Sequence, residues 1–165
     1  MKRIGIGRIF VVILTAFLLG ACSKVSAIEM GDDAKDISLV DIDGKPVSLA
    51  EFRGKVIILD FFASWCPPCR EEIPDFIKLQ NEYKDKGFSV VGVSLVDPKE
   101  SKDFARQIGI NYPIVVDDGR ASSAYGPVRG IPTTFVIDKN FKIARVYIGY
   151  RPKEVFENDI KELLR

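Results

Sequence analysis

The feature that most constrains the fold of this chain is an apolar run that leads directly into a pair of cysteines. Residues 56–62 read VIILDFF, a series of β-branched, aliphatic and aromatic residues that is typical of a strand buried on both faces. The sequence WCPPC follows at residues 65–69, and apolar residues then recur with helical spacing to residue 86. The sequence therefore predicts a strand, a short turn and a helix with both cysteines at its N-terminal end.

The patterns on either side of this unit predict an α/β domain built around one sheet. Two alternating segments around Asp43 and Gly44 predict a hairpin within residues 38–49. The remaining elements that we expect are strands at 88–95, 114–116, 133–137 and 142–148, and helices at 99–108, 121–125 and 152–164. Alternating βα units followed by a hairpin and a helix predict a mixed sheet with helices on both faces.

The first residues of the chain have the layout of a secretory signal peptide, which we expect to span residues 1–21. Lys2, Arg3 and Arg8 precede or open an apolar run at residues 9–19. An uncleaved transmembrane anchor is disfavoured, because a membrane span needs about 20 apolar residues. We therefore expect this segment to be removed on export.

A lipid anchor is expected at Cys22. The sequence LGAC at residues 19–22 resembles a bacterial lipobox, in which the cysteine after the cleavage site carries a diacylglyceryl group. The lipid would also account for the third cysteine of the chain, which is left over from the CxxC pair. Residues 22–36 show no period, so we expect a lipidated cysteine and a flexible tether there. The tether would hold a domain at residues 37–165 on the extracytoplasmic face of the cell envelope, in the periplasm of a two-membrane bacterium.

Charge and composition exclude two other kinds of site. The formal charge of +1 becomes −2 when the three basic residues of the leader are removed, so the domain lacks the concentrated basic face that nucleic-acid binding requires. The chain contains no histidine, the commonest metal ligand and general base. A CxxC pair supplies only half of the roughly four ligands of a zinc site. We therefore expect no metal, and no cofactor other than a redox-active disulfide.

The two cysteines are placed for disulfide exchange. A thiolate at a helix N-terminus is stabilised by the free N–H groups and the helix dipole, so Cys66 is the expected nucleophile. Cys69 lies one turn further and can form a disulfide with Cys66 or resolve a mixed one. A purely structural disulfide is the alternative. A two-residue gap contributes little chain entropy, however, and a structural role leaves the adjacent Trp65 and prolines unexplained.

Two motifs at this separation, WCPPC after DFFAS and GIPTTFVID at residues 130–138, resemble the thioredoxin superfamily. Over residues 37–165 the chain looks most like its membrane-tethered TlpA/ResA-like thiol–disulfide oxidoreductases. The resemblance implies a thioredoxin-like fold with an added N-terminal β-hairpin and a central insertion around residues 99–125. It implies that Cys66 is the exposed nucleophile and Cys69 the resolving thiol. It further implies a set of substrate-binding residues around the disulfide: Trp65, Pro67, Pro68, Ile131 and Pro132, the last following a cis peptide bond.

Two acidic residues are candidates for carrying the proton of Cys69. Glu72 is three residues after Cys69 on the same side of the helix, and it matches a glutamate of the ResA-like group. Asp60 lies among apolar residues of the strand, where burial would raise the pKa of a carboxyl group, and it matches the buried aspartate of thioredoxin itself. The alternatives are a solvated helix residue for Glu72 and a hydrogen-bonded residue at a sheet edge for Asp60. The sequence leaves the choice open.

We therefore expect an enzyme that exchanges thiols and disulfides with protein substrates outside the cytoplasm. The ResA-like resemblance implies a reductant fed by a membrane thiol donor, with apocytochrome c as a candidate substrate in cytochrome c maturation; we expect a monomer. A peroxiredoxin-type peroxidase would carry Pro and Thr or Ser where this chain has Leu59 and Ala63. A thioredoxin-like Cu(I) carrier of the Sco type would use a histidine, although thiolates alone can bind Cu(I).

Overall fold

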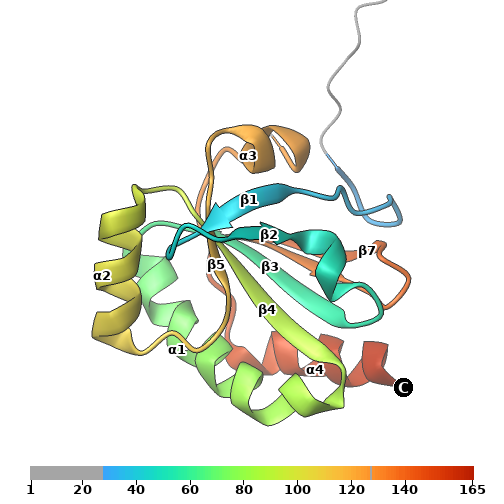
Figure 1. The fold of residues 1–165 in the computed structure, drawn as a ribbon. Coiled ribbons are helices and arrows are strands. Elements are labelled where there is room, and N and C mark those ends of the chain that lie inside the picture. The colour runs from blue at the N-terminus through green and yellow to red at the C-terminus, as the bar shows by residue number, and fades with distance from the viewer. Residues whose placement is uncertain (1–27, 127) are drawn as a thin grey trace, which may run out of the picture.

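A seven-stranded sheet forms the centre of the computed structural model, which describes residues 28–126 and 128–165. The expected signal peptide and Cys22 lie outside the described residues. The strand order is β2-β1-β5-β4-β3-β6-β7 (Figure 1). The strands are β1 (Ser38–Asp41), β2 (Pro46–Ser48), β3 (Val56–Phe62), β4 (Phe88–Ser94), β5 (Ile114–Val116), β6 (Thr133–Ile137) and β7 (Ile143–Ile148).

The sheet is mixed, as expected. β3, β4 and β5 run parallel to one another, whereas β6 pairs antiparallel with β3, and β7 with β6. The expected hairpin consists of β1 and β2, and β1 joins the sheet by pairing antiparallel with β5. β3 is buried along its whole length, so the cysteine motif follows directly from an interior strand of the sheet.

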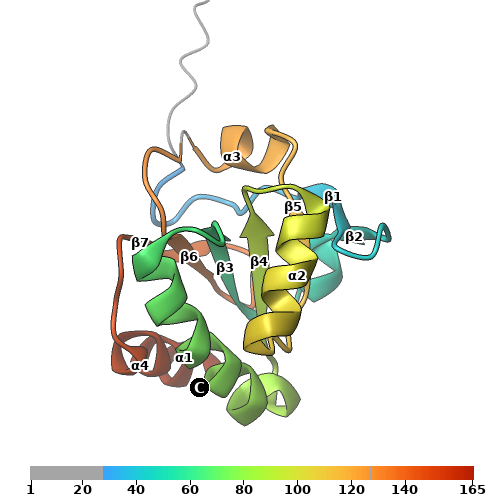
Figure 2. The ribbon, with the colours of Figure 1, turned by 90° about the vertical axis from the view of Figure 1, so that its left-hand side faces the viewer.

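The helices cover the two faces of the sheet unequally (Figures 1 and 2). Three of them pack on one face, here called the helix side: α1 (Pro67–Tyr83), α2 (Pro98–Ile108) and α4 (Lys153–Leu164). The other face, here called the opposite side, is covered by α3 (Arg120–Ala124), the 3-10 helix Leu49–Phe52 and residues 28–37. A second 3-10 helix, Lys84–Lys86, continues α1. None of the helices in the described residues is long and apolar enough to span a bilayer.

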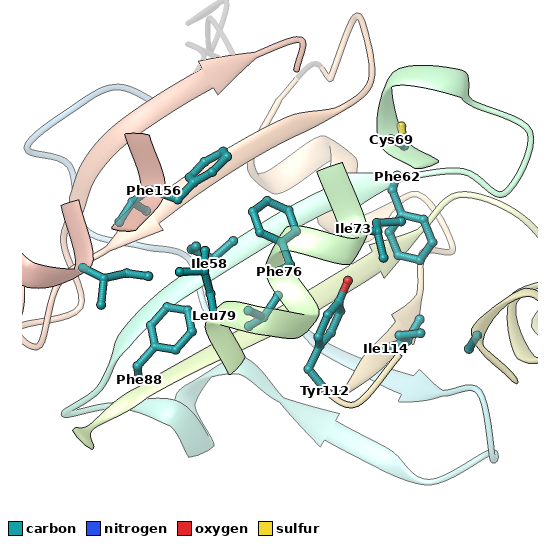
Figure 3. Close-up of a cluster of buried hydrophobic side chains, with 14 of the residues drawn as sticks. Ile58, Phe62, Cys69, Ile73, Phe76, Leu79, Phe88, Tyr112, Ile114 and Phe156 are labelled. Carbon is teal, nitrogen blue, oxygen red and sulfur yellow. The ribbon is translucent and has the colours of Figure 1, made fainter. Parts of the chain in front are cut away.

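Alternation along β3 decides which side chains reach which core. Val56, Ile58 and Phe62 belong to the helix-side core, whereas the apolar residues between them belong to the opposite-side core. Asp60 has the parity of the first set, so its carboxyl group is directed to the helix side. Figure 3 shows this core, with Cys69 at one end of it.

Residues 28–36 differ from the expectation that they belong to a flexible tether. Ile28 and Ala34 are buried in the opposite-side core. Asp33 forms a β-bridge with Lys142, and its carboxylate lies 2.8 Å from the Lys142 Nζ. Two isolated apolar anchors among polar residues produce no detectable period, which is why the sequence pattern missed this segment. The folded part of the chain therefore includes residues 28–36, which corrects the expected boundary at residue 37.

Candidate active site

The N-terminus of α1 holds the two cysteines as a disulfide. Cys66 is the N-cap residue and Pro67 occupies the first turn, where a residue without an N–H is tolerated because that N–H has no intrahelical partner. The backbone N–H of Cys69 donates a hydrogen bond of 3.3 Å to the Sγ of Cys66. After reduction the same N–H would face the Cys66 thiolate, which is how a helix N-terminus stabilises a charged sulfur.

The residues around the disulfide differ in how far they reach the surface. Trp65 is 68% exposed, whereas Cys66 is 3% exposed and Cys69 is fully buried. Pro67 is exposed and Pro68 is half-buried. The expected exposed nucleophile is therefore largely covered, because its neighbours close over it. Cys66 is still the sulfur that a partner can reach, since Cys69 has no accessible surface.

The loop before β6 lies against Cys66. The Ile131–Pro132 peptide bond is cis, as the resemblance implies, and Pro132 is buried while Ile131 is half-buried. The carbonyl oxygen of Ile131 lies 3.7 Å from the Sγ of Cys66, although the two residues are 65 positions apart in the sequence. The fold thus brings the two motifs of the sequence together at one place.

Two contacts brace the turn between β3 and α1, and sequence reasoning missed both. The guanidinium Nη1 of Arg70 donates a hydrogen bond of 3.0 Å to the carbonyl oxygen of Ser64. The hydroxyl of Ser64 donates to the carboxylate of Glu100, which lies in the first turn of α2. A hydrogen bond therefore links α2, which belongs to the expected central insertion, to the turn that carries Trp65.

Glu72 is one turn after Cys69 on α1 and is fully buried. Its Oε1 accepts a hydrogen bond of 2.8 Å from the backbone N–H of Arg151, which lies between β7 and α4. Burial raises the pKa of this carboxyl group to about 7, and the hydrogen bond from Arg151 offsets part of that effect. Glu72 is thus no solvated helix residue, and it can gain or lose a proton near neutral pH.

Asp60 is 1% exposed and lies in an interior strand flanked by β4 and β6, which excludes the alternative of a sheet-edge residue. The hydroxyl of Thr134 donates a hydrogen bond of 3.2 Å to its Oδ1. Burial raises the pKa of Asp60 well above its ordinary value, and the charge of Glu72 raises it further. The two acids are therefore electrostatically coupled, so that ionising one disfavours ionising the other.

A third buried polar group belongs to the same region and was not identified from the sequence. Tyr112 lies just before β5 and is 7% exposed. Burial and the charges of Asp60 and Glu72 raise the pKa of its hydroxyl well above the ordinary value. The Tyr112 hydroxyl, Asp60 Oδ2 and Glu72 Oε2 are buried without a hydrogen-bond partner among the described residues. Each such group costs about 1–3 kcal/mol, so three in one region require an explanation.

A cavity of about 460 Å³ adjoins the loop before β6. Gly130 and Thr133, which flank Ile131 and Pro132, line it together with residues of the opposite side. Its walls are mainly apolar, and Arg129 is the only charged side chain among the lining residues. The cavity therefore offers an apolar recess next to the surface through which Cys66 is reached.

The site has the groups needed for thiol–disulfide exchange and for proton transfer. Within residues 28–126 and 128–165, no group of three or more His, Cys, Asp or Glu side chains is placed to hold a metal ion. The arrangement can form and break a disulfide at Cys66 while a buried carboxyl group takes or returns a proton. This fold and this site define a thioredoxin-like thiol–disulfide oxidoreductase.

Comparison with known proteins gives the family. Residues 30–146 match the model of the AhpC/TSA family. The thiol-disulfide oxidoreductase ResA of Geobacillus thermodenitrificans is 37% identical over 144 residues, which make up 86% of this chain and 80% of that protein. A ResA of Bacillus cereus is 32% identical over 146 residues, 87% of this chain and 84% of that protein.

Solved structures agree with these relatives. A thiol:disulfide interchange protein of the thioredoxin family from Chlorobium tepidum is similar with a TM-score of 0.77 and 36% identity, over 84% of this chain and 100% of that chain. StoA from Bacillus subtilis is similar with a TM-score of 0.65 and 28% identity, over 75% of this chain and 95% of that one. The chain belongs to the AhpC/TSA family of the thioredoxin superfamily and, within it, to the ResA-like thiol–disulfide oxidoreductases.

Proposed function

We propose that this protein reduces disulfides of protein substrates outside the cytoplasm, with Cys66 as the nucleophile. The observation that carries the proposal is the position of the disulfide. It caps the N-terminus of α1, only Cys66 has accessible surface, and the loop with the cis peptide bond lies against its sulfur. Cys66 is therefore the sulfur that a substrate disulfide can reach.

The reaction transfers two electrons from the enzyme to the substrate. The thiolate of Cys66 attacks a substrate disulfide, whose S–S bond breaks; the leaving substrate sulfur takes a proton, and a mixed disulfide with Cys66 remains. Cys69 gives up its proton and attacks the Sγ of Cys66. The second substrate sulfur leaves and takes a proton, and the Cys66–Cys69 disulfide forms again. A membrane thiol donor would return the enzyme to its dithiol form by the reverse steps.

Glu72 is the proposed acceptor of the Cys69 proton. Its pKa of about 7 lets it act as a base near neutral pH, which is where a proton carrier is most effective. Asp60 is the second acid of the pair; burial and the charge of Glu72 raise its pKa well above the ordinary value. The proposed site contains no metal and no cofactor besides the disulfide.

The substrate is proposed to bind as an extended segment. Its backbone would pair with Ile131 beside Pro132, while its side chains contact Trp65 and the two prolines of the motif. Trp65 is 68% exposed, and Ile148, which is paired with Thr133 next to Pro132, is 67% exposed, so both offer apolar surface to a substrate. A cysteine-containing segment of apocytochrome c is the candidate substrate, and the enzyme would act on it as a monomer.

The proposed location is the outer face of a membrane. It is supported by the signal-like leader and by the lipobox around Cys22, together with a disulfide that persists in oxidising compartments. Labelling with a radioactive fatty acid tests the anchor: the wild-type chain should be labelled, and Cys22→Ser should not.

Insulin reduction coupled to a thiol donor tests the proposed activity. A separate assay with hydrogen peroxide as the substrate tests the peroxidase alternative. The reduction potential tests the direction of exchange. A value near about −270 mV supports a reductant, whereas a value near about −120 mV identifies an oxidant and overturns the proposed direction.

A further inference from the structure

We infer that Glu100 is a positioning residue for protein substrates, because it holds Ser64 and thereby the turn that presents Trp65. This role rests on the proposed function, in which Trp65 contacts the substrate. Glu100 belongs to α2, which shares the helix side of the sheet with α1 (Figures 1 and 2). α2 is the helix of the expected central insertion, so the insertion contributes to the redox site.

Ser64 directly precedes Trp65 and is held through both its hydroxyl and its carbonyl oxygen. The hydroxyl donates a hydrogen bond to the carboxylate of Glu100. The carbonyl oxygen accepts one of 3.0 Å from the Arg70 Nη1. Ser64 is buried, and buried polar groups of this kind need a partner. One partner comes from α2 and the other from α1, so the turn is fixed relative to both helices.

The carboxylate of Glu100 is not used to cap its own helix. Glu100 is at the position of α2 from which a glutamate often accepts a hydrogen bond from the N-cap N–H, in a capping box. Glu51 does so in the 3-10 helix Leu49–Phe52, at a distance of 2.9 Å. In α2, Asp97 caps the helix by accepting from two backbone N–H groups, and the carboxylate of Glu100 accepts from Ser64. This contact therefore serves the turn between β3 and α1.

α2 is a firm point of attachment, because its first turn is bonded to the end of β4. The hydroxyls of Ser94 and Ser101 are fully buried and lie 2.7 Å apart. One turn further along α2, the ring of Phe104 lies under the Arg70 guanidinium, 5.1 Å from its central carbon to the ring centroid. The residue that holds the Ser64 carbonyl thus also rests on α2, and the turn is attached to the sheet through this helix.

Trp65 gains from a fixed turn because 68% of its own surface is exposed. A mobile side chain loses conformational entropy when a partner orders it, and this loss weakens binding. A turn that is already ordered reduces the loss for any partner that contacts Trp65. Glu100 is itself exposed, so water can replace it as the partner of Ser64. Loss of Glu100 should therefore affect the order of the turn more than the stability of the fold.

The test compares Glu100→Ala with Glu154→Ala in the full chain. Both variants remove an exposed glutamate from the first turn of a helix, and with it a similar interaction with the helix dipole. The loss of enzyme thiols in one turnover, measured at increasing insulin concentration, gives the half-saturating concentration and the limiting rate. Glu100→Ala should raise the half-saturating concentration by about threefold or more and change the limiting rate less. Glu154→Ala should leave both at the wild-type values.

Further variants separate positioning from an effect of charge. Glu100→Gln keeps an oxygen that can accept from the Ser64 hydroxyl, so it should retain the wild-type half-saturating concentration. Ser64→Ala should resemble Glu100→Ala, and the double variant should be no weaker than either alone, because both changes remove the same contact. In a Trp65→Ala background, Glu100→Ala should have no further effect on insulin.

Fluorescence gives a readout that does not depend on turnover, because Trp65 is the only tryptophan in the sequence. Glu100→Ala should lower the steady-state anisotropy of its emission, whereas Glu100→Gln and Glu154→Ala should not. An anisotropy that stays at the wild-type value in Glu100→Ala overturns the inference.

Hydroxyethyl disulfide, which is too small to contact Trp65 while it reacts at Cys66, distinguishes the remaining outcomes. The preference for insulin over this compound should fall in Glu100→Ala. Equal losses with the two disulfides would assign Glu100 to the cysteine chemistry and overturn the inference, as would a Glu100→Gln that behaves like Glu100→Ala. The proposed function fails separately, if Cys66→Ala still reduces insulin.

Discussion

The cores on the two sides of the sheet both contain buried polar groups, but they differ in whether all of these groups have a hydrogen-bond partner among the described residues. On the opposite side the Tyr125 hydroxyl donates a hydrogen bond of 2.7 Å to the Lys35 carbonyl oxygen. The Thr133 hydroxyl donates one of 2.6 Å to the Gly130 carbonyl oxygen. On the helix side Tyr112 and two carboxyl groups keep oxygens without a partner among the described residues. Both sides otherwise consist mainly of buried apolar side chains.

This difference separates what stabilises the fold from what serves the reaction. Where a core serves only the stability of the fold, its polar groups are hydrogen-bonded or absent. The helix-side core gives up stability at three atoms, and these atoms lie in the same core as Cys69. Departures from good packing rules are expected where a site does chemistry. We therefore expect mutations on the two sides to differ in their effects on activity and on stability.

The largest expected effect is the loss of activity in Cys66→Ala. Without the reachable thiolate no mixed disulfide can form, so insulin reduction should fall by about 10³-fold or more. Cys69→Ala is the matched variant: it should form the mixed disulfide and be unable to resolve it. A covalent adduct with substrate should therefore appear on non-reducing gels for Cys69→Ala only, and an adduct formed by Cys66→Ala would contradict the assignment.

The next effect is on the pH dependence of stability, through Glu72. Its pKa is about 7 in the folded protein and 4.5 for a free glutamate side chain, so the folded state binds the extra proton between these values. Glu72 alone should therefore lower the free energy of unfolding by at most about 3–4 kcal/mol as the pH rises from about 4.5 to about 7. Asp60, whose pKa is also raised, adds to this fall.

Urea unfolding of the oxidised protein at several pH values measures this fall. Glu72→Gln should reduce the slope of the curve over that range, while Glu71→Gln, which changes an exposed neighbour on the same helix, should keep the wild-type slope. Equal slopes for wild type and Glu72→Gln would show that Glu72 does not hold the proton.

A smaller effect is expected from Gly92→Ala on the helix side. The added Cβ would lie 2.9 Å from the Phe62 Cε1, and overpacking of this kind costs about 1–3 kcal/mol. The control is Gly130→Ala, whose Cβ would meet nothing closer than the Ile148 Cγ2 at 4.0 Å. Thermal or urea unfolding that ranks the two variants in the reverse order would contradict the close packing of Gly92 against Phe62.

The smallest effect is expected on the opposite side, from Tyr125→Phe. It removes one satisfied hydrogen bond, which contributes about 1 kcal/mol, and Lys35 is exposed enough for water to take over as partner. Unfolding should therefore begin at slightly lower urea, while insulin reduction stays at the wild-type rate. A loss of activity without a loss of stability would mean that the two sides are not separate in function.

Much of the fold and the centre of the site could be predicted from the sequence. Buried strands such as VIILDFF have a strong pattern, and WCPPC marks a helix N-terminus through its prolines as well as its cysteines. The position of Asp60 among apolar neighbours was enough to mark it as a candidate acid. In these cases the deciding information is local, within one element.

What could not be predicted depends on contacts between distant elements. Tyr112 precedes a proline in a loop, and nothing near it in the sequence indicates that its ring covers Gly92, twenty positions earlier. The N–H of Arg151 reaches Glu72 across 79 positions. Residues 28–36 are held by two scattered apolar side chains and an ion pair with Lys142. Such contacts follow from the tertiary structure and leave no period in the sequence.

The docking of residues 28–36 also limits the reach of the enzyme. Ile28 lines the same cavity as Gly130, whose neighbour Ile131 lies against the Cys66 sulfur, so the chain enters the fold close to the redox opening. If Cys22 carries the proposed lipid, the five residues between it and Ile28 provide six Cα–Cα steps, which can extend at most about 21 Å. The surface around Cys66 would then stay within a thin layer next to the bilayer. Disulfides presented within that layer, on newly exported chains still close to the membrane, would be the ones within range.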